Sequence, residues 1–306
     1  MPDLPRRTLG RTGLEVTALG YGAMELRGEP RGPAVSDDDA SRILNAVLDS
    51  GINFIDTSPD YGNSEEHIGR SIAHRRGEYF LASKCGCIVG APPAPAGQRN
   101  PHVFTAENVR AGVEQSLRRM KTDYLDLVQF HISPSRTELE EQGALEELKK
   151  LQAEGKVRFL GMSGTLPNLR QHISMGVFDE FQIPYSALER EHEAAIAEAA
   201  AAGAGIVIRG GVARGAPAEW DRARQGLPVK DRWEGAKLDD LLNGMSRMEF
   251  TLRFTLSLPD LATTIVGTRN PAHLQENLDA AAKGPLPADV YAEAKRRLAD
   301  AGSKPE

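Results

Sequence analysis

Short apolar runs alternate with amphipathic stretches along most of the chain. The apolar runs predict strands that begin at residues 16, 52, 79, 125, 157, 180, 206 and 263, and the stretches between them have the spacing of helices. Eight strand–helix units are the number that closes a parallel barrel. We therefore predict a fold of the α/β class, a (β/α)8 TIM barrel in one domain that spans residues 1–306.

Elements at the ends of the repeating units complete this prediction. Arg7–Thr12 is expected to form a small hairpin that plugs one end of the barrel, and Val16–Gly20 is the first barrel strand. Ser36 is the expected N-cap of the first helix, because the three aspartates after it favour the positive end of the helix dipole. Further helices are predicted over Ser64–Ala73, Ala106–Met120, Glu138–Glu154, 167–175, Glu191–Ala202, Met245–Leu256, Pro271–Ala282 and, as an extra C-terminal helix, Ala288–Ala301.

The composition is that of an ordinary globular protein and argues against two classes of partner. The net charge is −6, from 37 Lys and Arg against 43 Asp and Glu, so no basic face for nucleic acid is implied. No segment approaches the roughly 18 consecutive apolar residues of a membrane span, and the N-terminus has no apolar signal core. We expect a cytoplasmic protein without a nucleic-acid or membrane partner, as a monomer or a homo-oligomer.

No metal site is predicted. Cys85 and Cys87 are one residue apart, which is the spacing of neither a zinc knuckle nor a redox pair, and a bridge between them would be strained. We expect free thiols in a reducing cytoplasm. Glu65, Glu66 and His67 are consecutive residues of a predicted helix, and consecutive residues do not share one helix face.

Four polar residues follow neighbouring strands. Asp56, Lys84 and His131 end the second, third and fourth predicted strands, and Tyr61 lies just beyond the second. Neighbouring strands are about 5 Å apart, so these side chains can meet in one pocket. A lysine cation would lower the pKa of the tyrosine from its usual value of about 10, an aspartate would keep the lysine charged, and a histidine would orient a carbonyl. The set predicts protonation of a carbonyl oxygen while a hydride arrives at carbon.

Each of these residues also has a simpler interpretation. Asp56 and Lys84 can form a structural ion pair under the barrel mouth, Tyr61 can be an ordinary rim aromatic, and His131 a hydrogen-bonded strand end. Active sites of barrels lie at this end, which favours the functional interpretation for the four residues together.

The chain resembles the aldo-keto reductase family over nearly its whole length. The matching segments are GRTGLEVTALGYGAM, GINFIDTSPDYGNSEEHIG, LASKCG, VRAGVEQSLRRMKTDYLDLVQFH, GKVRFLGMSG, EFQIPYSALER and TTIVGTRNPAHLQENL. The resemblance implies a barrel that binds NADPH at its carboxyl end without a Rossmann domain, and no G-x-G-x-x-G follows a strand here. It also implies Tyr61 as general acid, Lys84 and Asp56 as the pair that tunes it, and His131 as the residue that orients a small-molecule carbonyl substrate.

The resemblance further implies a nicotinamide site with two departures. Ser163 and Gln182 stand where the family contacts the carboxamide, whereas Gly164 replaces the usual asparagine and Arg209 an aromatic residue that often stacks on the ring. A guanidinium can stack too, but its charge disfavours the oxidised ring, so we expect Arg209 either to favour the reduced cofactor or to reach a phosphate. The other residues expected at this part of the cofactor are Gly22, Ala23, Met24 and Asp56.

A second segment resembles the clamp for the adenosine and its 2′-phosphate. It comprises Gly267, Thr268, Arg269, His273, Glu276 and Asn277. Arg269 is its strong cation and is expected to bind the 2′-phosphate, and a helix that begins at Asn270 and Pro271 would point its amino end there. We therefore predict NADP rather than NAD. Arg269 as a simple strand–helix cap is the alternative.

The long loops are expected to form the substrate walls. They are Gly86–Pro101 and the irregular stretch Gly211–Leu238, in which Trp220 and Trp233 either line the pocket or pack the loop. The leading function is NADPH-dependent reduction of an aldehyde or ketone. The alternatives are an aldolase in which Lys84 forms a Schiff base, and a non-catalytic, nucleotide-binding redox-sensing subunit.

Overall fold

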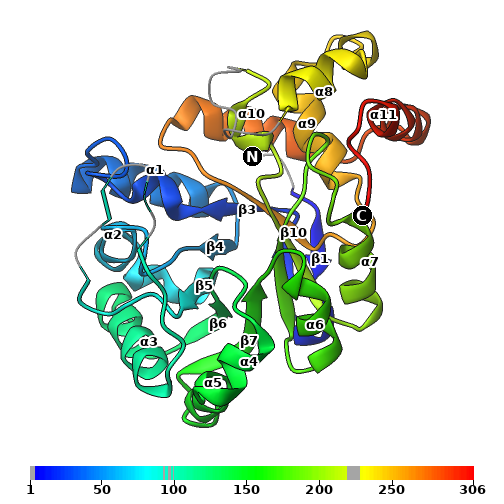
Figure 1. Ribbon diagram of the computed structural model, residues 1–306. Helices are drawn as coiled ribbons and strands as arrows, with labels where there is room; N and C mark the ends of the chain where they lie inside the picture. Colours follow the sequence, from blue (N-terminus) through cyan, green and yellow to red (C-terminus); the bar gives the residue numbers. More distant parts are fainter. Residues whose placement is uncertain (1–3, 92–93, 96–97, 99, 219–227) are drawn as a thin grey trace.

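The barrel predicted from the alternating pattern is present. The computed structural model describes residues 4–91, 94–95, 98, 100–218 and 228–306. Eight parallel strands close in the order β10-β3-β4-β5-β6-β7-β8-β9, and the helices surround them (Figure 1). This confirms the (β/α)8 fold class.

The barrel strands are short and mostly buried, as a parallel sheet covered by helices requires. They are β3 Leu19–Gly22, β4 Phe54–Asp56, β5 Phe80–Cys85, β6 Leu125–Phe130, β7 Val157–Ser163, β8 Glu180–Pro184, β9 Gly205–Arg209 and β10 Thr263–Val266. In the register of the sheet, Asp56 pairs with Gly22 on one side, and Ser163 pairs with Gln182. The carboxyl ends of the strands therefore bring the predicted polar residues to one edge.

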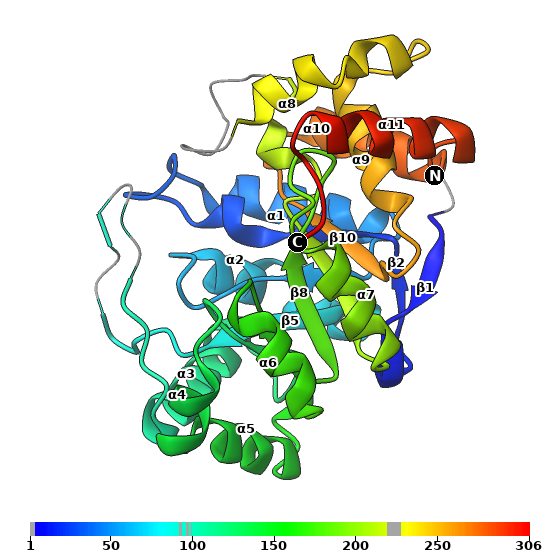
Figure 2. The same cartoon turned by 45° about the vertical axis from the view of Figure 1, so that its right-hand side comes forward.

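The N-terminal hairpin is longer than predicted. Its strands are β1 Arg6–Thr8 and β2 Glu15–Thr17, which run antiparallel and lie side by side in Figure 2. Arg7 pairs with Val16, so the apolar residue that we assigned to the first barrel strand belongs to the hairpin instead. The barrel begins only at Leu19, after the chain has turned out of this pairing.

The hairpin plugs the amino end of the barrel, as predicted. Leu9, Leu14 and Val16 pack in one buried cluster with Phe54 of β4 and Val207 of β9, two strands that are not neighbours in the barrel. The turn at Gly10–Thr12 approaches the barrel so closely that a Cβ at Gly10 would lie 2.2 Å from the backbone nitrogen at the start of β9. Apolar contact therefore closes this end of the barrel.

Most helices begin and end near the predicted residues. They are α1 Asp37–Asp49, α2 Ser64–Ser71, α3 Ala106–Met120, α4 Arg136–Glu141, α5 Ala144–Ala153, α6 Asn168–Met175, α7 Glu193–Ala201, α8 Val229–Gly235, α9 Arg247–Leu256, α10 Pro271–Ala282 and α11 Ala288–Asp300. The Ser36 side chain caps α1 by accepting from the backbone nitrogen of Asp39. No helix in the described part of the chain is long and apolar enough to cross a membrane.

Two helical predictions were wrong. The single helix over Glu138–Glu154 is two helices, α4 and α5, because Gly143 between them has a positive φ of 72° that continues neither helix. The stretch Gly211–Leu238 is not irregular throughout, since it contains α8. The buried indole of Trp233 anchors α8, because it packs edge-on against Phe250 of α9.

Candidate functional site

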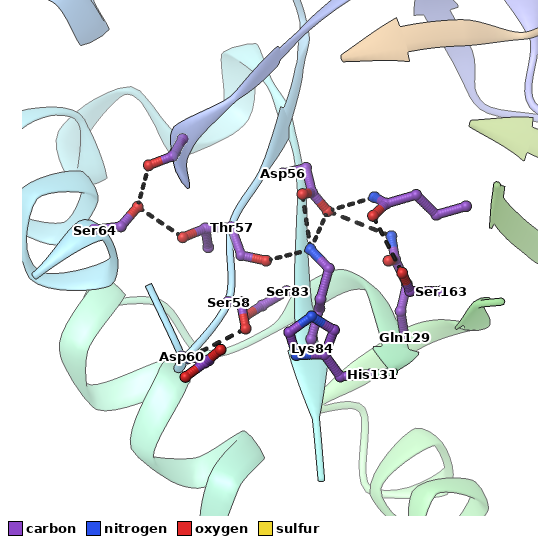
Figure 3. A network of polar contacts seen from close by, with 12 residues as sticks. Asp56, Thr57, Ser58, Asp60, Ser64, Ser83, Lys84, Gln129, His131 and Ser163 are labelled. Atoms are coloured by element: carbon purple, nitrogen blue, oxygen red, sulfur yellow. Dashed lines mark hydrogen bonds and ion pairs between the residues drawn. The ribbon is translucent and has the colours of Figure 1, made fainter. Parts of the chain in front are cut away.

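A buried ion pair lies where β4 and β5 end. Lys84 places Nζ 2.8 Å from both carboxylate oxygens of Asp56 and 2.8 Å from the carbonyl oxygen of Thr57 (Figure 3). The two side chains are almost fully buried. Burial acts to lower the pKa of Lys84, but the charge and hydrogen bonds of Asp56, together with the nearby Tyr61, outweigh it and the pKa is raised. The amine is therefore held as an ammonium group with three acceptors.

Tyr61 lies next to this pair. The Lys84 Nζ is 5.1 Å from the centroid of the Tyr61 ring. Withdrawal from water raises the pKa of Tyr61 above its usual value, and the Lys84 charge acts in the predicted direction but offsets only part of that rise. The net pKa is thus raised rather than lowered, and the phenol keeps its proton at neutral pH.

His131 completes the predicted group and brings two unpredicted residues with it. Its ring follows β6 and lies edge-on to Tyr61, with 6.2 Å between the ring centroids. Its Nδ1 is 3.0 Å from Nε2 of His102 and 3.5 Å from Sγ of Cys87. The structure therefore brings Asp56, Tyr61, Lys84 and His131 together, and it adds a thiol and a second imidazole beside them.

A large cavity opens at this end of the barrel. Its volume is about 1500 Å³, enough for a dinucleotide beside a small substrate. Asp56, Tyr61 and His131 line it near the barrel axis, whereas Lys84 lies behind its wall. The remaining predicted residues on the wall are Gly22, Met24, Ser163, Gln182, Arg209, Gly267, Thr268, Arg269, His273, Glu276 and Asn277.

The ion pair is joined to the predicted carboxamide contacts. The Gln182 side-chain nitrogen donates to Asp56 at 2.9 Å, and the Ser163 hydroxyl donates to the Gln182 side-chain oxygen at 3.4 Å. Arg209, at the end of β9, also faces the cavity, and its charge acts to lower the pKa of Tyr61. One polar network thus runs from the buried ammonium group to the cavity wall.

The structure explains the glycine at position 164. A Cβ on Gly164 would lie 2.9 Å from a methyl carbon of Leu169, and Leu169 is fully buried in α6. An asparagine there would require the Leu169 side chain to shift. The glycine at 164 therefore fits the close packing of α6 on the end of β7.

The outer arm of the cavity lies between β10 and the amino end of α10. Asn270 caps α10 by accepting from the backbone nitrogen of Ala272, with Pro271 in the first turn. The buried Tyr21 hydroxyl donates to the Thr268 carbonyl oxygen at 2.8 Å and fixes the preceding turn. Arg269 donates to the Ala34 carbonyl oxygen at 3.4 Å, so its side chain reaches across the arm rather than only capping the turn.

Several predicted positions lie away from the cavity. Ala23 is fully buried, and its carbonyl oxygen accepts from the Ser64 hydroxyl. No described residue of Gly86–Pro101 lines the cavity, and residues 92–93, 96–97 and 99 of this loop lie outside the described residues, so the substrate wall expected there stays a prediction. Trp233 packs the loop and donates to Asp239 at 3.0 Å, and Trp220 lies outside the described residues.

The helical trio Glu65, Glu66 and His67 does not converge on one point. Both glutamates pair with Arg119, and His67 pairs with Asp37. Among the described residues, the one group of three or more His, Cys, Asp or Glu side chains that converges as metal ligands do is Cys87, His102 and His131. Cys87 and His131 stood out in the sequence for other reasons, but nothing pointed to His102, because it follows an irregular loop.

Two other charged residues, one on the cavity wall and one buried inside the barrel, were also missed. Arg31 lines the cavity and pairs with Asp60 at 2.9 Å, next to Tyr61 in the chain. Glu180, at the start of β8, is fully buried without a hydrogen-bond partner for its carboxylate among the described residues, and burial raises its pKa. Nothing in the alternation of polar and apolar residues distinguishes Glu180 from an exposed strand start.

Comparisons with known proteins agree with this architecture. A sequence model of the Aldo/keto reductase family matches residues 18–298. The chain is 28% identical over 302 residues to L-galactose dehydrogenase of Arabidopsis thaliana (92% of this chain, 89% of the relative). It is 31% identical over 200 residues to the NADH-specific methylglyoxal reductase of Escherichia coli (60% of each). The structure of aldo-keto reductase AKR11C1 from Bacillus halodurans in its holo form is similar, with a TM-score of 0.81, 25% identity and 96% of each chain covered.

Proposed function

This chain belongs to the aldo-keto reductase family, and we propose that it reduces an aldehyde or ketone to the alcohol with NADPH. The membership makes it an oxidoreductase that acts on carbonyl and alcohol substrates. NADPH, when bound, supplies the hydride. The proposal assigns the other steps, which are binding, orientation and proton transfer, to residues of this chain.

The observation that carries the proposal is the buried ammonium group beside a protonated phenol. Lys84 has its Nζ 5.1 Å from the Tyr61 ring centroid and is held charged by Asp56. A tyrosine whose pKa is raised by burial keeps its proton until an alkoxide forms next to it. The adjacent Lys84 charge then stabilises the phenolate that is left behind. Tyr61 is therefore the proposed general acid.

His131 is the proposed residue for substrate orientation. It lines the cavity with Tyr61, and the two rings are edge-on. Its Nδ1 faces Cys87 and His102, so Nε2 is the ring nitrogen that would meet a substrate oxygen. A hydrogen bond from Nε2 would hold the carbonyl oxygen near the phenol, which is the geometry that proton transfer requires.

The proposed preference for NADPH depends on the outer arm. Arg269 is a cation on the cavity wall beside the amino end of α10, where a phosphate is favoured. Near Tyr61, burial and then the charge of Arg209 lower the pKa of His192, and the same charge acts to lower the pKa of Tyr61. Arg209 would therefore also disfavour the positive ring of the oxidised cofactor. Comparing the affinities of wild type and Arg209→Tyr for the two redox forms tests this; an unchanged preference would dismiss it.

The aldolase alternative is disfavoured by the same ion pair. A Schiff base needs a neutral amine, whereas Lys84 is buried and its three contacts go to Asp56 and Thr57. The alternative of a redox-sensing subunit is distinguished by turnover. Slow or absent reduction with intact cofactor binding would favour that alternative.

The most direct test follows NADPH oxidation with a panel of aldehydes and ketones. Wild type should turn over at least one of them, and Tyr61→Phe should lower kcat by about 10²–10⁴-fold with NADPH affinity retained. Tyr79→Phe is the matched control, because Tyr79 is a buried tyrosine whose hydroxyl bonds the Ile72 carbonyl oxygen, away from the cavity wall. Equal rates for wild type and Tyr61→Phe would refute the assignment of the general acid.

A further inference from the structure

Three side chains with metal-binding atoms converge beside the cavity. The Cys87 Sγ is 3.5 Å from the His102 Nε2 and 3.5 Å from the His131 Nδ1, and the two nitrogens are 3.0 Å apart. The three atoms therefore form a small triangle. Thiolate and imidazole are ligands that Zn²⁺ favours.

The triangle has nearly the dimensions of a tetrahedral zinc site. With Zn–S of about 2.3 Å and Zn–N of about 2.0–2.1 Å, sulfur and nitrogen ligands lie about 3.6 Å apart and two nitrogens about 3.3 Å apart. The two sulfur–nitrogen separations match this, and the imidazole nitrogens at 3.0 Å need to part by only a few tenths of an ångström. A small rotation of the His131 ring about its side-chain bonds is enough for that change.

The backbone holds the ligands in place without any ion. Cys87 and His102 face each other across an antiparallel bridge. The Asn108 side-chain amide, from α3, donates to the carbonyl oxygens of both Cys87 and Val103. His131 is fixed by its own backbone nitrogen, which donates to the Cys85 carbonyl oxygen at 3.1 Å. Two separate strand ends are thus locked in the positions that a shared ligand needs.

The surroundings resemble the outer shell of a metal site. The Ser58 hydroxyl lies 3.6 Å from Sγ of Cys87, a position from which it can stabilise a thiolate. The His102 ring stacks on Phe104, with 6.4 Å between centroids, which limits its rotation. Cys87 is buried, while His102 and His131 are partly exposed, so an ion can enter from the side of the cavity.

We propose that Cys87, His102 and His131 bind one Zn²⁺ ion, with the fourth position left to a water molecule on the cavity side. Binding replaces the thiol proton by the metal, and that proton is released to solvent. The proposal goes beyond the reductase function and does not depend on it. It reverses the expectation from the sequence that the chain has no metal site.

The test uses the full chain, stripped of metal by a chelator and then titrated with Co²⁺ as a spectroscopic substitute for Zn²⁺. We expect saturation at one ion per chain, with the visible bands of a tetrahedral ion and a thiolate-to-cobalt charge-transfer band, all removed by added Zn²⁺. Cys87→Ser should abolish the charge-transfer band. His102→Gln should weaken Zn²⁺ binding by more than the roughly 10–100-fold that loss of an outer-shell partner causes.

Two matched variants serve as controls. Cys85→Ala removes the other thiol, which is buried in the core, and His74→Gln removes an exposed imidazole far along the chain from the cluster. Both should keep the full cobalt spectrum. A charge-transfer band that persists in Cys87→Ser, or one that is lost in Cys85→Ala, would overturn the proposal.

A measurement on the unmodified chain removes any dependence on the folding of the variants. X-ray absorption at the zinc edge should show a mixed shell of one sulfur at about 2.3 Å with two imidazole nitrogens and one water oxygen at about 2.0–2.2 Å. A shell of nitrogen and oxygen alone, or the absence of stoichiometric binding, would mean that the three residues form only a hydrogen-bonded cluster.

Discussion

The barrel is sealed at the amino ends of its strands and open to a cavity at their carboxyl ends. At the amino end, Leu9, Leu14 and Val16 of the hairpin seal the strands with apolar contacts. At the carboxyl end, strands finish in polar residues such as Asp56 and Ser163, which line a cavity. The difference shows that apolar packing at the amino end stabilises the barrel, whereas the residues that can do chemistry lie at the carboxyl end. Lys84 is the residue where the two roles meet, because it is buried like a core residue but charged like a site residue.

The largest effect is expected at that meeting point. Lys84→Met should abolish detectable reduction and lower the free energy of unfolding by about 3–5 kcal/mol, because it leaves the Asp56 carboxylate buried without its cation. Denaturant unfolding and NADPH oxidation measure the two quantities.

The double variant Lys84→Met with Asp56→Asn separates these two losses. It removes both charges, so part of the lost stability should return while activity stays absent. If the double variant is no more stable than the single one, the buried carboxylate is not the cause of the instability.

A substitution at the amino end, which the hairpin plugs, should lower the free energy of unfolding and leave kcat unchanged. Leu9→Ala should lower the free energy of unfolding by about 2–5 kcal/mol, since Leu9 is fully buried in the hairpin cluster. Its kcat should equal that of wild type at a temperature where both are folded. A kcat that falls together with the free energy of unfolding would show that the two ends are coupled and do not have separate roles.

A smaller effect is expected on the outer arm of the open end. Arg269→Ala should reduce the preference for NADPH over NADH by about tenfold, or about 1.4 kcal/mol, with little change in stability. The ratio of kcat/KM for the two cofactors measures it, and Arg42→Ala is the control, because Arg42 is an exposed arginine of α1. Equal rates with NADH and NADPH in wild type would reverse the proposed cofactor preference.

The smallest effect is expected for the dependence of kcat on pH. Because burial raises the pKa of Tyr61, the phenol stays protonated below its ordinary value of about 10, and a general acid acts in its protonated form. The kcat of carbonyl reduction should therefore be flat from neutral pH to about 9. A fall of kcat centred in that range, present in wild type and missing in Tyr61→Phe, would show that the Lys84 charge outweighs burial.

The sequence predicted the fold better than the ends of its elements. Ala106–Met120 and Pro271–Ala282 were predicted with the observed bounds, because a side-chain cap precedes each helix. The hairpin was misplaced because Val16 pairs with Arg7, and a strand does not reveal its partner from its own residues. The break at Gly143 was missed because the apolar period continues across the glycine.

The same limit applies to the site. Asp56, Lys84 and His131 could be predicted to meet because each directly follows a strand, and parallel strands end at one edge. His102 could not, because its position depends on the path of the chain after β5 and on a single bridge to Cys87. The burial of Glu180 was equally hidden, since only the closed barrel places it inside.

The packing of Leu169 over Gly164 has a consequence for how this site can evolve. Asparagine at 164 would need a smaller residue at 169 to make room, and shrinking a fully buried leucine by itself costs about 2–5 kcal/mol. Each single change is therefore expected to lower stability, and the paired change is expected to restore part of it. Residues 164 and 169 are therefore expected to be coupled, so a library that varies position 164 alone should return asparagine less often than one that varies 164 and 169 together.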